Sequence, residues 1–172
     1  GAAATRQFAD ADNMTLEIGA LGALLSIGKG EEQLKHFYER WQSDRLVIDK
    51  WFALQIGQAA PKDAVSIAAD LSNHADFNWK NPNRFRAVIG ALAMNPAGFH
   101  DPTGAGYRLV ADWLIRLDPV NPQTTARMVG VFETLRRYDA DRQGMIRAEL
   151  QRILGTTGLS RDTTEMASRI LG

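Results

Sequence analysis

The sequence predicts an all-α protein in which antiparallel helices stack as pairs. Apolar residues recur with the 3.6-residue period of an α-helix along most of the 172 residues, and no convincing run alternates Val, Ile and Thr as a strand would. Each of the 6 prolines lies just before or at the start of an apolar-periodic segment. Helices of similar length with short connections are typical of a HEAT- or armadillo-like α-solenoid, although no strict sequence period marks a repeat.

Eight to nine helices are expected, and several are defined by one apolar stripe each. The expected ranges are 13–27, 31–43, 45–57, 61–73, 81–94, 104–117, 121–137, 139–154 and 160–171. The stripes are Leu34, Phe37, Tyr38 and Trp41 in the second helix; Val47, Trp51 and Leu54 in the third; Leu109, Val110, Trp113, Leu114 and Leu117 in the sixth; and Met128, Val129, Phe132 and Leu135 in the seventh.

Capping residues indicate where these helices begin and end. An Asn or Asp side chain can accept from the free N–H groups of a first turn, and a following proline has no N–H to leave unpaired. Pro61 opens one helix, and five Asn-Pro or Asp-Pro pairs give further start signals at Asn81, Asn95, Asp101, Asp118 and Asn121. Asp44, Asp139 and Ser160 are expected N-caps without proline, and Gly57, Gly155 and Gly158 are expected C-terminal stops.

Composition narrows the class of protein. Lys+Arg and Asp+Glu both number 20, so the zero net charge argues against a nucleic-acid or anionic-membrane binder. The absence of Cys excludes disulfides, thiolate zinc sites and Cys nucleophiles. No apolar run approaches the roughly 18 residues of a membrane span. We therefore expect a cytoplasmic protein that binds neither nucleic acid nor membrane.

The chain start indicates a piece of a longer protein. The first residue is Gly and not Met, and the first eight residues lack the basic and apolar regions of a signal peptide. We expect residues 1–172 to form one domain cut from a longer chain. Residues 1–12 are expected to be partly a linker or an added segment.

Catalytic motifs are absent from the sequence. His36, His74 and His100 are scattered, with no partner three or four residues away, and there is no His-Glu-x-x-His zinc motif. There is no nucleophile elbow and no phosphate loop. The sequence therefore predicts no catalytic residue, no metal ligand and no cofactor within this chain.

Three polar residues at helix starts are candidates for substrate binding. Arg84 would lie in the first turn of its helix, where the helix dipole disfavours a cation. Gln123 and Arg127 are separated by four residues and share one helix face. A guanidinium beside an amide can bind a carboxylate or peptide carbonyl through forked hydrogen bonds. The alternative is that both arginines are solvated or pair with an Asp of a neighbouring helix.

Seven phrases, in order and at similar spacings, resemble the C-terminal helical domain of bacterial aminopeptidase N, the alanyl-type family of zinc aminopeptidases. The resemblance runs from about Arg6 to the C-terminus. The phrases are Ala11-Asp-Asn-Met-Thr15, Leu46-Val-Ile-Asp-Lys-Trp-Phe52, Asn81-Pro-Asn-Arg84, Asn95-Pro-Ala-Gly-Phe-His100, Gly104-Ala-Gly-Tyr107, Asn121-Pro-Gln123 and Arg136-Arg-Tyr-Asp-Ala140.

The resemblance implies a function for the parent chain and a supporting role for this domain. Members of the family are four-domain zinc exopeptidases whose thermolysin-like domain supplies the metal ligands. Their C-terminal domain is a helical solenoid that closes over the active site and lines the peptide cavity. Carried over by motif, Gln123 would lie by the pocket for the first substrate side chain, and Arg127 and Arg84 would face the cavity.

A second hypothesis belongs to a different class of protein. An autonomous α-solenoid could bind a partner protein in its concave groove. The two hypotheses are distinguished by the reading frame upstream of Gly1. A His-Glu-x-x-His motif several hundred residues before it supports the aminopeptidase, whereas an adjacent start codon supports the autonomous module.

Overall fold

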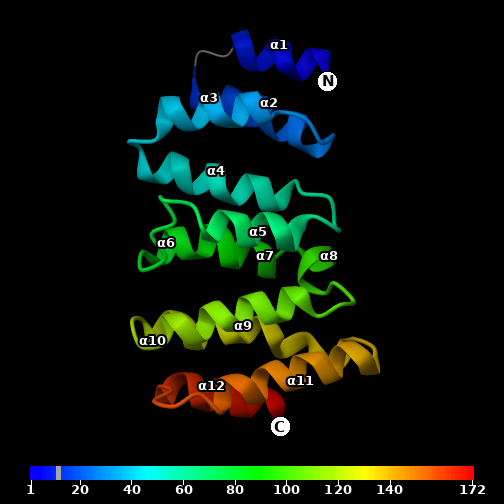
Figure 1. The fold of residues 1–172 in the computed structure, drawn as a ribbon, viewed down its shortest axis with the longest axis vertical. Helices are drawn as coiled ribbons and strands as arrows, with labels where there is room; N and C mark the ends of the chain where they lie inside the picture. The colour runs from blue at the N-terminus through cyan, green and yellow to red at the C-terminus, as the bar shows by residue number, and fades with distance from the viewer. Residues whose placement is uncertain (11–12) are drawn as a thin grey trace.

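The computed structural model describes residues 1–10 and 13–172 and confirms an all-α solenoid. Within these residues, every regular element is helical, and successive helices stack along the long axis from α1 to α12 (Figure 1). The elements are α1 (Ala2–Asp10), α2 (Met14–Ser26), α3 (Glu31–Trp41), α4 (Arg45–Gly57), α5 (Ala64–Ser72), α6 (Pro82–Phe85), η1 (Arg86–Gly90), α7 (Ala91–Ala93), α8 (Pro96–Phe99), α9 (Ala105–Leu117), α10 (Pro122–Val129), η2 (Gly130–Arg137), α11 (Ala140–Leu154) and α12 (Arg161–Leu171).

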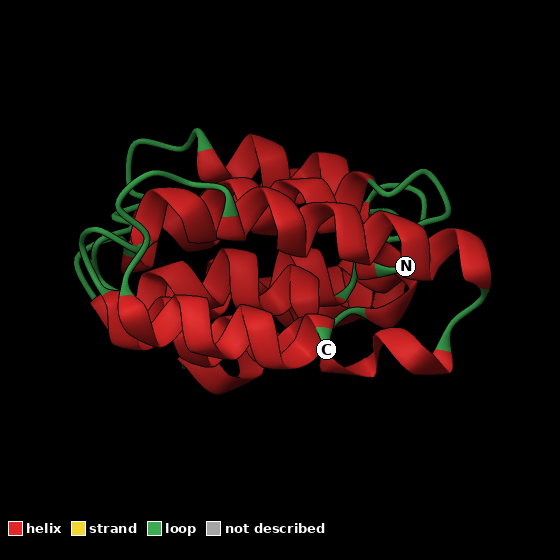
Figure 2. Cartoon of the chain, turned by 90° about the horizontal axis from the view of Figure 1, so that it is seen from below, coloured by secondary structure: helices red, strands yellow, loops and turns green. Residues whose placement is uncertain are grey.

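The helices form two layers, visible as two rows when the stack is seen along its length (Figure 2). One layer includes α5, α9 and α11, which pack in succession. The other layer includes α4, the continuous segment α6–η1–α7, and α10 with α12. Consecutive helices such as α9 and α10 pack across the layers, as expected for helical pairs joined by short loops.

The core lies between the two layers and is rich in aromatic rings. The predicted stripes supply it: Phe37, Val110 and Phe132 are fully buried. Phe99 and Tyr107 meet edge to face with ring centroids 5.1 Å apart, which joins the short helix α8 to α9. The apolar period in the sequence therefore identified the inner face of these helices.

The expected caps are confirmed at six helix starts. The side chains of Asp44, Asn81, Asn95, Asn121, Asp139 and Ser160 each accept a hydrogen bond from a backbone N–H of the following turn. Gly57 is the last residue of α4 and Gly155 caps α11. Gly158 has φ of 77° and turns the chain into α12, a conformation that suits glycine.

Two of the expected start signals are wrong. Asp101 accepts from the Thr103 N–H in a tight turn, and α9 begins only at Ala105. Asp118 opens no helix, because its buried carboxylate accepts from the Ser160 N–H and hydroxyl, both at 2.7 Å, and from the Thr163 hydroxyl at 2.6 Å. Asp118 thus joins the end of α9 to the start of α12.

Some helix bounds also differ from the expected ranges. Residues 61–63 form a turn closed by Asp63 N–H donating to the Ala60 carbonyl, so α5 begins at Ala64. The start signal at Asn95 opens α8, a helix absent from the expected ranges.

The N-terminal segment contains a helix within the range 1–12, which was expected to be partly a linker or an added segment. Residues Ala2–Asp10 form α1, which packs on α2 and has a buried Phe8. Residues 11–12, which begin the first resemblance phrase and lie in the expected linker, fall outside the described residues.

Two segments depart from α-helical geometry. Residues Arg86–Gly90 form a π turn inside the helix that begins at Pro82, and residues Gly130–Arg137 continue α10 as a 3-10 helix. Such segments inside longer helices are uncommon and are often found at functional sites. Both lie in the layer that also carries the candidate residues.

Candidate functional site

Gln123 and Arg127 lie on the exposed side of α10, as their spacing predicts. Asn121 accepts from the Thr124 N–H at 3.0 Å and holds the first turn that carries Gln123. Buried Thr125 and Met128 anchor the opposite side of the helix. The polar pair therefore faces outward because the helix buries its other face.

The pair opens onto a groove between α10 and α12. The groove has a volume of about 500 Å³ and is lined by Gln123, Ala126, Arg127, Asp162, Glu165, Met166 and Arg169. Among the described residues, no acidic side chain lies within ion-pair distance of Arg127. Its guanidinium is therefore available to an acceptor from outside the domain.

The part of the groove formed by α12 was not predicted as a site. Asp162 and Glu165 place carboxylates across from Arg127, and Glu165 pairs with Arg161 at 3.0 Å. Arg169 lies near Glu133 of η2 at 3.9 Å. The sequence does show an exposed polar stripe on the last helix. The packing of that helix against α10, however, is a long-range contact that the sequence alone does not reveal.

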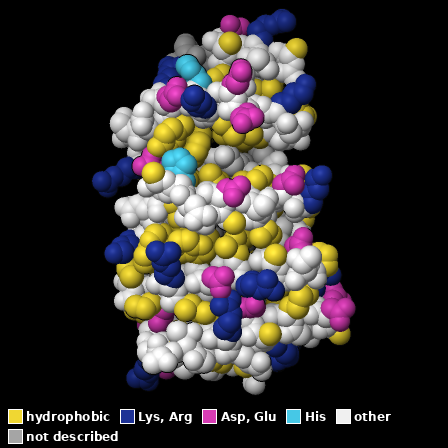
Figure 3. Space-filling view, in the orientation of Figure 1, with side chains coloured by type: hydrophobic (Ala, Val, Ile, Leu, Met, Phe, Trp, Pro, Cys, Tyr) yellow, Lys and Arg dark blue, Asp and Glu magenta, His cyan; other side chains and the backbone are white. Residues whose placement is uncertain are grey.

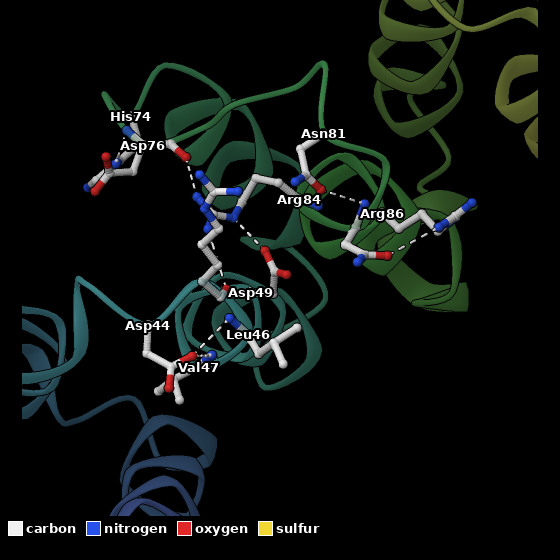
Figure 4. A network of polar contacts seen from close by, with 11 residues as sticks. Asp44, Leu46, Val47, Asp49, His74, Asp76, Asn81, Arg84 and Arg86 are labelled. Carbon is white, nitrogen blue, oxygen red and sulfur yellow. Dashed lines mark hydrogen bonds and ion pairs between the residues drawn. The ribbon is translucent and has the colours of Figure 1, made fainter.

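Arg84 has a different environment, because it is only 8% exposed. Its Nε donates to Asp49 of α4 at 2.5 Å and its Nη1 donates to the Asp76 carbonyl (Figure 4). Its Nη2 lies 3.5 Å from the Arg45 carbonyl, and the guanidinium stacks over the Phe52 ring at 5.1 Å. Arg84 therefore pairs with an Asp of a neighbouring helix, which is the alternative considered above.

Asp76 connects Arg84 to the loop before α6. Besides the carbonyl bound by Arg84, its N–H donates to Nδ1 of His74 at 3.0 Å, and its carboxylate accepts from the Tyr38 hydroxyl. Burial, assisted by the nearby Arg84 charge, lowers the pKa of His74. A neutral His74 keeps Nδ1 free as an acceptor, so the loop is held at three atoms of Asp76.

Arg84 also lines a smaller cavity of about 270 Å³ that is separate from the α10–α12 groove. The cavity lies between the α3–α4 loop, the loop before α6, and α6 itself, with Gln42, Arg45, Asn78 and Asn81 in its wall. The structure therefore brings Gln123 and Arg127 together and places Arg84 at another position in the stack.

His100 belongs to a cluster of packed aromatic rings. His100 stacks on Tyr138 with ring centroids 3.8 Å apart, and its Nδ1 lies 2.6 Å from the Tyr107 hydroxyl. Burial raises the pKa of Tyr107 to about 12 and lowers the pKa of His100. Both rings are therefore neutral near pH 7.

Lys or Arg and Asp or Glu side chains are interspersed on the face shown in Figure 3, without a region of one sign. Within residues 1–10 and 13–172, no three His, Cys, Asp or Glu side chains gather where they could hold a metal ion. Every helix in the same ranges is too short or too polar to cross a bilayer.

The fold and the groove define a class of protein: a helical ARM-type solenoid domain with a polar, arginine-containing groove and no metal centre of its own among the described residues. All 172 residues match the family model described as "Domain of unknown function (DUF3458_C) ARM repeats". The chain belongs to this family.

Curated relatives and solved structures agree with this assignment. The chain is 42% identical over 168 residues to aminopeptidase N of Caulobacter vibrioides and 36% identical over 170 residues to that of Escherichia coli. These alignments cover 96% and 97% of the chain but 19% of each relative. The chain therefore spans about a fifth of the length of these relatives, and its resemblance to the C-terminal part of aminopeptidase N is confirmed.

A solved structure shows the same fold over nearly the whole chain. Aminopeptidase A of Legionella pneumophila, solved in complex with aspartic acid, superposes with a TM-score of 0.92 at 34% identity. The match covers 99% of this chain and 20% of that one. The fold is therefore shared with one part of a much longer aminopeptidase.

Proposed function

We propose that this chain is the non-catalytic C-terminal domain of a zinc-dependent aminopeptidase, which releases N-terminal amino acids from peptides. The domain covers the active site of the longer chain and lines its peptide cavity. The observation that carries this proposal is that the whole chain aligns with aminopeptidase N relatives, of which it spans a fifth. Residues 1–172 then form one domain of that chain.

Gln123 and Arg127 are the proposed peptide contacts. Gln123 lies by the pocket for the first side chain of the substrate, and Arg127 donates to a carbonyl or carboxylate further along. The support is that both are exposed on one side of α10 and line one groove. Arg84 contributes to the cavity wall, since its nitrogens already donate to acceptors within the domain.

The zinc ion of the proposed enzyme is bound outside the described part of this chain. The donor groups there form no cluster that could hold a metal, so the zinc of the proposed enzyme belongs to another domain. The partners of this domain are the catalytic and other domains of the same chain, together with the peptide substrate. The enzyme is proposed to be a cytoplasmic bacterial protein, without nucleic-acid or membrane partners.

The test substitutes Arg127 in the full-length aminopeptidase. Arg127→Ala is expected to raise KM for a peptide roughly 10- to 100-fold, because a charge-assisted hydrogen bond contributes about 1.5–3 kcal/mol. KM for an alanyl reporter amide should change less, since that substrate is too short to use the contact. Steady-state kinetics with both substrates measures the difference.

A neighbouring substitution provides the control. Arg137→Ala removes an exposed arginine of η2 that lines none of the described cavities. It should leave both KM values unchanged. An unaltered peptide KM in Arg127→Ala would contradict the proposed role of this surface.

A further inference from the structure

Helix α2 presents an apolar side to solvent. Leu16 is 45% exposed, and Ile27, which caps the helix, is 50% exposed. The two residues are close to three helical turns apart, so they share one side of the helix with exposed Ala23. Within residues 14–27 the one charged residue, Glu17, is buried, and it accepts from Nε1 of Trp41 at 2.7 Å. An uncharged helix side of this kind is typical of a packed surface.

The opposite end of the stack has a charged outer side. Figure 1 shows α1 and α2 at one end and α11 and α12 at the other. The exposed residues of α12 include Arg161, Asp162, Glu165 and Arg169. Terminal repeats of solenoid proteins have a polar outer face, because no further repeat covers them. Helix α12 has this character, whereas α2 has the character of a helix that a neighbour covers.

Helix α1 covers a different side of α2. Phe8 is the buried residue of α1, and its ring meets that of His36 in α3 edge to face, with centroids 5.9 Å apart. The other residues of α1 are exposed, apart from Ala4, which is half-buried. Helix α1 therefore leaves Leu16 and Ile27 open to solvent and is itself packed on one side only.

The chain enters the structure beside this apolar side. A Cβ added to Gly1 would lie 3.8 Å from Cδ1 of Ile27 and 3.6 Å from Nζ of Lys29. Lys29 and Thr5 also line a cavity of about 970 Å³ between the α2–α3 loop and the α4–α5 loop. A residue that precedes Gly1 therefore starts near Ile27, with open space around it.

We propose that a helix of the same chain, directly before Gly1, packs an apolar side on Leu16, Ala23 and Ile27. This inference rests on the proposed function, in which the chain is the C-terminal part of a protein about five times as long, as its 19% coverage of the relatives implies. Helices joined by short loops pack antiparallel, so the added helix runs antiparallel to α1 and continues the stack. The surface of α2 is then an internal contact of the longer protein.

Hydroxyl-radical footprinting of the proposed full-length aminopeptidase measures whether these side chains are covered. The labelling rate of each residue is divided by its rate in urea. Leu16 and Ile27 are expected to be labelled roughly tenfold more slowly than in urea, as for core residues. Val120, in the α9–α10 loop, is 46% exposed and should keep about half of its rate in urea. Leu16 and Ile27 labelled at about half their rates in urea, as their 45% and 50% exposure gives, would overturn the proposal.

A cross-link identifies the segment that covers α2. In the full-length protein, Ile27→Cys carrying a benzophenone label should join, on irradiation, to a peptide within one repeat before Gly1, which is about 20–45 residues. Mass spectrometry of the digested product identifies that peptide. Thr164→Cys, at an exposed position of α12, is the matched control and should not join to the same segment. A cross-link from position 27 to the catalytic domain or to a second copy would contradict the proposal, as would the absence of any cross-link.

The failure of this inference differs from a failure of the proposed function. If Arg127→Ala raises the peptide KM but Leu16 and Ile27 are labelled as half-exposed residues, the helix contact is wrong and the peptide-binding role stands. If Leu16 and Ile27 are protected but Arg127→Ala leaves the peptide KM unchanged, the helix contact stands and the peptide-binding role fails.

Discussion

Three arginines of one helix layer show how burial determines what a guanidinium can do. Arg84 is enclosed by Asp49, the Asp76 carbonyl and the Phe52 ring. Arg86 and Arg127 are exposed and have no carboxylate partner among the described residues. A side chain whose donors are occupied stabilises the fold, whereas an exposed one can bind a ligand.

The free energy of unfolding should therefore fall much more when Arg84 is replaced than when Arg127 is replaced. Arg84→Ala leaves Asp49 partly buried without its cation, so we expect a loss of about 3 kcal/mol in the free energy of unfolding. Arg127→Ala should change it by no more than about 0.5 kcal/mol, since exposed positions contribute little. Urea denaturation of both variants measures the difference, and equal losses would contradict the environment described for Arg84.

At this scale the sequence predicted the helix face of Gln123 and Arg127 but not the burial of Arg84. Both α10 residues follow from a helical wheel with a strong apolar opposite side. A signal for Arg84 was available, because the residues four and eight positions later, Val88 and Leu92, are apolar and buried. Its partner Asp49 lies 35 residues earlier, so the pairing depends on tertiary packing.

At the scale of helices, close contact between α8 and α9 depends on one missing side chain. A Cβ on Gly106 would lie 2.5 Å from the Phe99 carbonyl oxygen and 2.6 Å from that of Gly98. Backbone atoms cannot move aside as a flexible side chain does, so only glycine permits this approach. The contact places Phe99 against Tyr107 in the core.

A matched pair of substitutions tests this account of the contact. Gly106→Ala should destabilise the protein by about 2–3 kcal/mol, as expected for overpacking against rigid atoms. Gly19→Ala, in α2, should stabilise it by about 0.5–1 kcal/mol, because a Cβ there meets nothing within 4 Å and alanine favours the helix. Thermal unfolding followed by circular dichroism gives both values. A Gly106→Ala protein as stable as the parent would show that the helices do not pack this closely.

A helix start could be predicted wherever the capping side chain accepts a hydrogen bond from a backbone N–H of the turn that directly follows it. Asn81, Asn95 and Asn121 do so, because the interaction is local and Asn-Pro specifies it. Asp118 has the same local sequence pattern, but its carboxylate binds Ser160 and Thr163 across the stack. The π turn at Arg86–Gly90 likewise has no signature in the apolar period.

At the scale of the whole molecule, the two-layer stack sets which residues a ligand can reach. The layer containing α6–η1–α7, α10 and α12 carries the exposed pair Gln123 and Arg127, which lines the groove between α10 and α12. The domain supplies no metal ligands from its described residues, so its proposed contribution to catalysis is to bind and orient the peptide.

The most direct test of this account is a crystal structure of the proposed full-length aminopeptidase with a non-hydrolysable peptide bound. The account predicts that Gln123 and Arg127 face the internal cavity, with the Arg127 guanidinium within hydrogen-bond distance of a peptide oxygen. It also predicts that Arg84 remains paired with Asp49 behind the cavity wall. A structure in which this face of α10 lies on the outer surface, away from the peptide, would contradict it.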